Sequence, residues 1–172
     1  MCQQNRSFDI LCMLNITIIC IGRLKEKYYT DAANEYIKRL SGYCKLEVVE
    51  LSEQRLSDIS SEAQLVTALE KECLAIEKVI PPGTTTVALC IEGREIDSRG
   101  LSDFLTDCAG RGASRISFIV GGSNGLHEAF KKNAGFRLSM SKMTFPHNLA
   151  RVILLEQLYR AFKIAEGGKY HK

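Results

Sequence analysis

The stretch from Phe136 to Phe162, FRLSMSKMTFPHNLARVILLEQLYRAF, decides how the rest of the chain is interpreted. A short strand-like run leads through residues 141–145 to Pro146, which suits the first turn of a helix because its missing N–H is no loss there. In residues 152–155, four consecutive apolar side chains point in four directions around that helix. We therefore expect the helix to be covered on both sides, by another layer of the same domain or by a second copy of the chain.

Upstream of this stretch, apolar strands alternate with helices. The 172 residues are 45% apolar and 25% charged, which fits one globular domain with one core. Alternation of this kind predicts an α/β fold around a mostly parallel sheet. Strands are expected at 14–21, 43–51, 85–91, 115–120 and 136–140, and helices at 28–40, 62–80, 98–109, 126–133 and from Pro146 onward.

Three segments follow predicted strands, at the edge where α/β sheets bind ligands. They are Glu92-Gly93-Arg94, the glycine-rich GGSNG at 121–125, and 140–145. GGSNG is neither G-x-G-x-x-G nor a P-loop, and as a lone motif it fits a ligand loop and a plain tight turn equally well. The third segment mixes hydroxyl groups with apolar bodies, which suits a nucleoside better than a polyphosphate.

Composition sets further limits. The net charge of +3 does not by itself suggest a nucleic-acid partner, and the seven cysteines lack a C-x-x-C pair, so we expect free thiols in a reducing cytoplasm. The apolar run at 10–21 is too short to span a bilayer and lacks a cleavage site, so we interpret it as a buried strand. Residues 1–13 are expected to be a disordered extension, with Met13 as an alternative start, and 14–172 to form the domain.

The histidines show no metal signature, because His127, His147 and His171 lie far apart without a spaced Cys or carboxylate partner. His147 at the helix start is interpreted as a structural histidine, and Glu156 with Arg160 as an ordinary helix pair. The basic tail at 169–172 fits a partner-binding segment and a fraying end equally well.

The terminal third carries the most specific pattern: a GGSNG loop, then LSMSKMTFPH, then RVILLEQLYRAFKI, then YHK. Together with IGRLKEKYY near the amino end, this pattern resembles the RlmH family of SPOUT-class RNA methyltransferases over residues 14–172. The resemblance implies a homodimer whose carboxyl end forms a trefoil knot and binds S-adenosylmethionine. Carried over by position, the implied cofactor contacts are Leu89, Gly121, Met140, Ser141, Lys142, Met143, Thr144 and Phe145.

The resemblance also implies methylation at N3 of a pseudouridine in large-subunit ribosomal RNA, on the assembled ribosome. Removing the N3 proton requires a base or a positive field, for which His171 and Arg151 with Lys172 are the candidates. Arg23, Lys25, Lys27, Tyr170 and Lys172 are the candidate RNA contacts. Lys169 stands where relatives often carry proline. The alternative function is a nucleotide-binding or ribosome-associated α/β module without catalysis.

Overall fold

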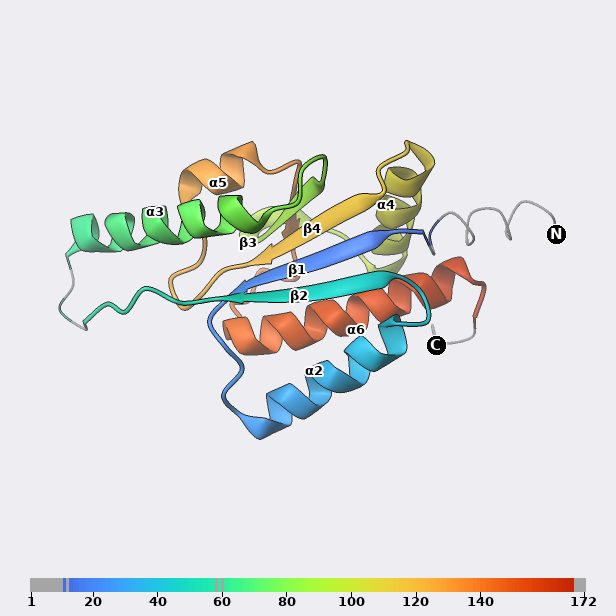
Figure 1. The fold of residues 1–172 in the computed structure, drawn as a ribbon, viewed down its shortest axis with the longest axis horizontal. Coiled ribbons are helices and arrows are strands. Elements are labelled where there is room, and N and C mark those ends of the chain that lie inside the picture. Colours follow the sequence, from blue (N-terminus) through green and yellow to red (C-terminus); the bar gives the residue numbers. More distant parts are fainter. Residues whose placement is uncertain (1–10, 12, 58, 60, 169–172) are drawn as a thin grey trace.

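The computed structural model describes residues 11, 13–57, 59 and 61–168, and strands alternate with helices along this part of the chain (Figure 1). The expected single α/β domain is confirmed. The strands are β1 (Asn15–Ile21), β2 (Lys45–Leu51), β3 (Thr85–Glu95), β4 (Arg115–Val120) and β5 (Phe136–Ser139). The helices are α2 (Lys27–Leu40), α3 (Glu62–Val79), α4 (Ser98–Gly110), α5 (Glu128–Asn133) and α6 (His147–Ala165).

The sheet has five strands in the order β2-β1-β4-β3-β5, and every neighbouring pair is parallel. All the strands therefore end at the same edge, where the β1–α2, β2–α3 and β4–α5 connections meet. Side chains on a strand alternate between the two faces of the sheet. In β1, Ile16 and Ile18 belong to one core cluster and Ile19 and Ile21 to the other.

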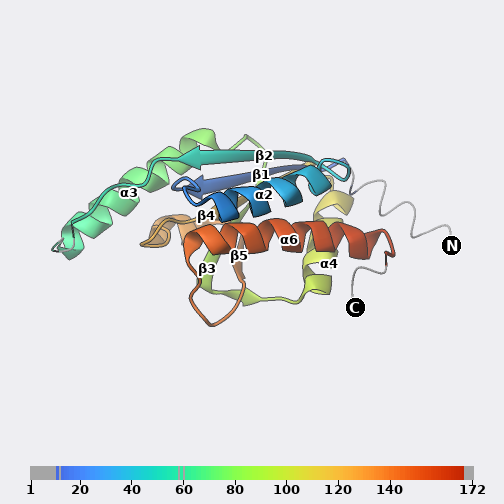
Figure 2. The same ribbon diagram turned by 90° about the horizontal axis from the view of Figure 1, so that it is seen from below.

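Helices cover both faces of the sheet. α2, α4 and α6 pack on one face and α3 and α5 on the other, as the two core clusters show. Figure 2 shows α6 running between α2 and α4, and it contacts both. Because each parallel crossover must return over one face, the helices supply the apolar cover that a parallel sheet requires.

The helix α6 is buried on its inner side and half-covered elsewhere. Every residue from His147 to Ala165 is buried or half-buried, including Leu149 and Ile153 on the side away from the sheet. Pro146, expected as the first helical residue, is instead the N-cap with extended backbone (ψ 135°). The reason is that its φ of −53° suits either position, and the helical hydrogen bonds begin one residue later.

Strand β3 is longer than predicted. The sequence suggested that Glu92-Gly93-Arg94 forms a loop, but these residues belong to β3, which ends at Glu95. After an irregularity, β3 pairs with β5 a second time, so that Leu138 is the partner of both Leu89 and Arg94. A Cβ on Gly93 would lie 2.6 Å from the Leu138 carbonyl carbon, so only glycine allows the two backbones to approach this closely.

The described cysteines are free thiols, as expected: Cys20, Cys44, Cys73 and Cys108 are buried and Cys90 is half-buried. Cys2 and Cys12 lie outside the described residues.

Of the predicted N-terminal extension, the structure describes Leu11 and Met13. Leu11 is fully buried in the core beside Leu14, whereas Met13 is exposed. The expected disorder therefore does not apply to Leu11, and for the other residues it stays a prediction. Among the described residues, no helix is both long and apolar enough to cross a membrane.

Candidate functional site

A cavity of about 1140 Å³ opens at the carboxyl edge of the sheet. Its walls are the end of β3, the glycine loop at 121–125 and the segment 138–147, which leads from β5 into α6. Val66 and Leu69 of α3 and Lys131 of α5 complete the lining. The volume suits a ligand of cofactor size. A cavity is thus present at the edge of the sheet where the sequence predicted ligand binding.

Most of the predicted cofactor residues come together here. Lys142 is the exception, because it is exposed and lies outside the lining. The sequence placed the others on separate strands and loops, and the parallel sheet brings their ends to one edge. The residues that line the cavity are Leu89, Gly121, Met140, Ser141, Met143, Thr144 and Phe145.

The glycine loop is a tight turn with its backbone against the cavity. The Gly125 N–H donates to the Gly122 carbonyl at 3.1 Å, and Gly125 has φ +78°, which favours glycine. A Cβ on Gly121 would lie 2.4 Å from the Gly125 carbonyl oxygen. The interpretation of GGSNG as a tight turn is therefore confirmed, and the turn also lines the cavity, whereas its contact with a ligand stays a prediction.

The segment after β5 is shaped by its own hydroxyl groups. The Ser139 hydroxyl donates to the Ser141 carbonyl at 3.0 Å, and the Ser141 hydroxyl accepts from the Met143 N–H at 3.0 Å. These local bonds curl the chain around the cavity rim. Met143 is 68% exposed and lies at the mouth of the cavity.

An ion-pair cluster forms the wall opposite this segment. Lys131 pairs with Glu92 of β3 and with Glu128 of α5, and all three line the cavity. The hydrogen bond from Lys131 lowers the pKa of the Glu92 carboxyl. Burial acts to lower the pKa of the Lys131 ammonium, but the hydrogen bonds and charges of Glu128 and Glu92 outweigh burial and raise the pKa, so that Lys131 stays charged. Sequence reasoning missed this cluster because Glu92 belongs to β3, whereas Glu128 and Lys131 belong to α5.

Cys90 lies in the same wall. Burial, reinforced by the nearby Glu92 carboxylate, raises the pKa of its thiol, so the thiol is protonated at neutral pH. Because the thiolate is the nucleophilic form, Cys90 is not suited to carry a covalent intermediate.

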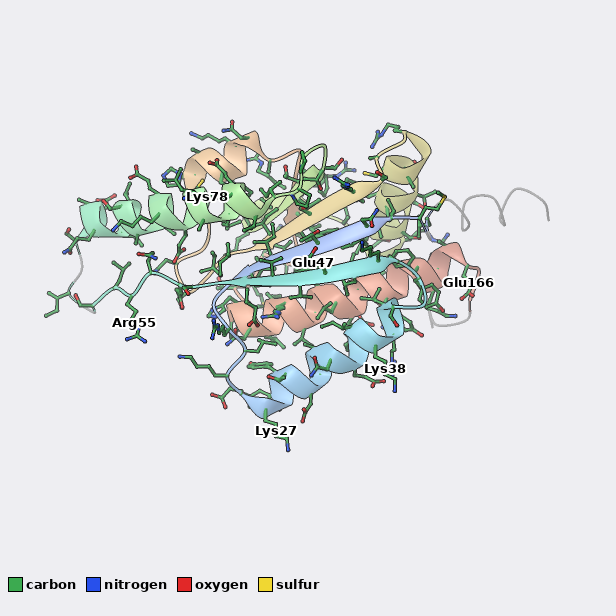
Figure 3. The ribbon with its side chains drawn as sticks, viewed as in Figure 1. Lys27, Lys38, Glu47, Arg55, Lys78 and Glu166 are labelled. Atoms are coloured by element: carbon green, nitrogen blue, oxygen red, sulfur yellow. The ribbon has the colours of Figure 1, made fainter. Side chains whose placement is uncertain are left out.

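The predicted RNA and catalytic residues that the structure describes lie outside the cavity lining. Arg23 and Lys25 are exposed on the β1–α2 connection, and the exposed Lys27 extends outward at the start of α2 (Figure 3). Arg151 is 6% exposed, and its Nη1 donates to Glu50 Oε1 of β2 at 2.6 Å. Its catalytic role stays a prediction. Tyr170, His171 and Lys172 lie outside the described residues.

A parallel sheet with an apolar cavity above a glycine loop defines an α/β domain that binds a nucleoside-like cofactor. Residues 14–171 match the family model described as "Predicted SPOUT methyltransferase". The chain therefore belongs to the SPOUT methyltransferase family.

Relatives agree with this family. A ribosomal RNA large subunit methyltransferase H from Clostridium botulinum (strain Alaska E43 / Type E3) is 48% identical over 159 residues, covering 92% of this chain and 100% of that protein. A putative one from Methanococcus maripaludis (strain C5 / ATCC BAA-1333) is 45% identical with the same coverage. The crystal structure of a probable methyltransferase from Bordetella pertussis Tohama I matches the fold with a TM-score of 0.56 at 15% identity, over 92% of this chain and 99% of that chain.

SPOUT methyltransferases use S-adenosylmethionine. The cavity fits this molecule in three respects. Its volume is sufficient, apolar side chains such as Leu89 and Met140 suit the adenine ring, and the glycine loop lines the cavity at Gly121, Gly122 and Gly125. The sequence had implied the same cofactor.

The close approach at Gly121 generates the first prediction. Gly121→Ala places a Cβ 2.4 Å from the Gly125 carbonyl oxygen, so the turn must open and the cavity wall must shift. We expect the Kd for S-adenosylmethionine, measured by calorimetry, to rise by about tenfold or more. The control is Gly110→Ala at the end of α4, where a Cβ meets open space. Equal affinities in the two variants would contradict the assignment of this wall.

Proposed function

We propose that this protein transfers the methyl group of S-adenosylmethionine to N3 of a pseudouridine in large-subunit ribosomal RNA, on assembled ribosomes in the cytoplasm. The observation that carries the proposal is the cavity lined by the GGSNG loop and the segment 140–145. The chain is also 45–48% identical, over 92% of its length, to relatives named ribosomal RNA large subunit methyltransferase H.

Methyl transfer requires alignment of the reacting atoms more than it requires acid catalysis. Bound S-adenosylmethionine supplies a methyl group on a sulfonium whose sulfur leaves neutral, so the protein's main task is to place the nucleophile in line with that methyl group. The curled segment after Ser139 and the tight turn at Gly121 hold opposite sides of the cavity. Both walls depend on backbone geometry, and they are therefore suited to fixing the cofactor in one position.

The target nitrogen must lose its proton. We assign the base to His171, and the positive field that stabilises the developing anion to Lys172 and Arg151. Arg151 is held by Glu50, and its Nε has no hydrogen-bond partner among the described residues. In this proposal Arg151 acts through its field and not by touching the base, because it lies outside the cavity lining.

We propose that the active form is a homodimer that uses the outer side of α6. Leu149 and Ile153 lie on that side, close along the helix to His147 and Ala150, which line the cavity. A second copy there would complete the burial of these apolar side chains. The tail of one subunit would then reach the cavity of the other.

The knot is part of the same proposal. β5 is flanked by β3 twice, at Leu89 and at Arg94, and Gly93 lies against the β5 backbone. The chain leaves β5 next to this double pairing and continues into α6, and this path is consistent with the trefoil knot that the family resemblance implies. The knot would then fix the segment 140–145 against the cavity.

Exposed basic residues at the same edge are proposed to contact the ribosomal RNA. Arg23, Lys25 and Lys27 follow β1, and Arg55 extends outward from the β2–α3 connection (Figure 3). Phosphate contacts release counterions, so the affinity for ribosomes should fall with salt. Tyr170 and Lys172 are assigned to the same surface.

The second prediction tests the activity. Purified protein, incubated with S-adenosylmethionine and ribosomes from cells that lack the gene, should methylate one pseudouridine in the large-subunit RNA. Mass mapping of that RNA before and after incubation measures the change, with the Gly121→Ala variant as the control. Cofactor binding without any transfer to ribosomes would support a non-catalytic module instead.

The third prediction concerns the base. His171→Ala should reduce the rate of methyl transfer by about 100-fold or more, because a general base contributes on that scale. The affinity for S-adenosylmethionine should stay unchanged if the histidine acts only on the RNA base. Single-turnover rates on ribosomes measure the first effect and calorimetry the second. Full activity would remove His171 from catalysis.

The fourth prediction concerns the dimer. Ile153→Asp introduces a charge on the outer side of α6, where a partner subunit would have to desolvate it. We expect a monomer with reduced activity, detected by sedimentation velocity. The matched control is Leu74→Asp on α3, on the opposite face of the sheet, where the native side chain is 57% exposed. A soluble, active Ile153→Asp dimer would show that the interface lies elsewhere.

A further inference from the structure

Glu53 makes a contact between two strands that are not neighbours in the sheet. It lies just after β2, whereas the glycine loop follows β4, and β1 runs between them. The Glu53 carboxylate nevertheless reaches across the end of β1 and accepts a hydrogen bond from the Ser123 N–H at 2.7 Å. A charged acceptor makes such a bond stronger than one between neutral groups.

Two glycines lie beside this carboxylate, and at one of them a side chain would collide with it. A Cβ on Gly122 would lie 2.7 Å from Glu53 Oε1, and a Cβ on Gly22 at the end of β1 would lie 3.9 Å from Glu53 Oε2. Gly122 thus has no room for a side chain on the side where the carboxylate lies. The carboxylate and the bare backbone of the loop fit each other closely.

The backbone next to Glu53 is itself fixed by a hydrogen bond. The adjacent Gln54 N–H donates to Glu72 Oε1 at 2.7 Å, and Glu72 is a buried residue of α3. This bond ties the β2–α3 connection to α3 next to Glu53. The carboxylate therefore reaches the glycine loop from a fixed position and not from a free loop.

The Glu53 carboxylate lies near Ser123, His147 and Lys25. Burial acts to raise its pKa, but the hydrogen bonding from Ser123 and the nearby His147 and Lys25 outweigh burial and lower the pKa, so Glu53 is ionised at neutral pH. The His147 imidazole is close, since a Cβ on Gly22 would lie 3.4 Å from His147 Nε2. His147 lines the cavity and begins α6 directly after the segment 140–146.

We propose that Glu53 is a positioning residue for cofactor binding, which holds the glycine loop through the Ser123 N–H. Glu53 itself is not among the residues that line the cavity, but Ser123 is. Glu53 therefore acts on the wall formed by the glycine loop, and its contribution is to keep that wall in the arrangement that the cofactor requires. This inference rests on the assignment of the cavity to S-adenosylmethionine.

The fifth prediction compares three substitutions of the full chain. Glu53→Ala removes the acceptor, and we expect the Kd for S-adenosylhomocysteine, a stable analogue, to rise about tenfold. Glu53→Gln keeps an oxygen that accepts from Ser123, and its Kd should stay within about threefold of the unsubstituted chain. The control is Glu47→Ala, an exposed glutamate on the edge strand β2 (Figure 3), for which no change is expected.

A second readout separates positioning from general stability. The amide proton resonance of Ser123 reports the hydrogen bond in the absence of ligand, and it should move in Glu53→Ala but much less in Glu53→Gln. An unchanged Kd in Glu53→Ala would overturn the inference, as would an equal loss in both substitutions. If the unsubstituted chain does not bind the analogue, the cofactor assignment fails first, and the role of Glu53 fails with it.

Discussion

The double pairing of β5 with β3 is the constraint on which the site depends. Leu138 of β5 pairs with both Leu89 and Arg94 of β3. The backbone at Gly93 approaches the Leu138 backbone so closely that a side chain on residue 93 would not fit. Because β5 cannot move away from β3, the chain that leaves it at Ser139 starts from a fixed point. The cavity walls formed by β3 and by the segment after β5 are therefore two parts of one interaction.

Close backbone packing at glycines also shapes the wall formed by the glycine loop. At Gly121 and Gly122 the missing side chains allow close packing against Gly125 and against Glu53. Glycine at such positions loses more backbone entropy on folding than any other residue, and the close contacts offset that cost only when the whole edge is assembled. The site is thus built from backbone groups that are brought close and fixed by contacts from other elements, and few of its features depend on a single catalytic side chain.

Local pattern was sufficient to predict the fold and the position of the cavity. The alternation of apolar strands with helices, the apolar residues on both faces of β1 and β4, and the loops at strand ends each follow from nearby residues. The limits of that reasoning lie where contacts join distant elements. Glu92 was predicted to lie in a loop because β5, the strand with which this end of β3 pairs, comes much later in the chain. Glu53 was one polar residue among several in the β2–α3 connection, and its contact with Ser123 was not predicted. The resemblance to relatives supplied the cofactor residues, which periodicity alone did not single out.

The charges at this edge are arranged so that most of them already have partners. Lys131 is neutralised by Glu92 and Glu128 on one wall, and Glu53 faces Ser123, His147 and Lys25. These paired groups contribute little net field inside the cavity, whereas the exposed Arg23 on the β1–α2 connection and Lys27 at the start of α2 are available to phosphates. This division suits a bisubstrate site. The walls hold a small cofactor mainly by shape and backbone contact, and the rim attracts a large polyanion by charge. A change in salt should then affect RNA association while leaving cofactor binding nearly constant, because the two use different forces from adjoining residues.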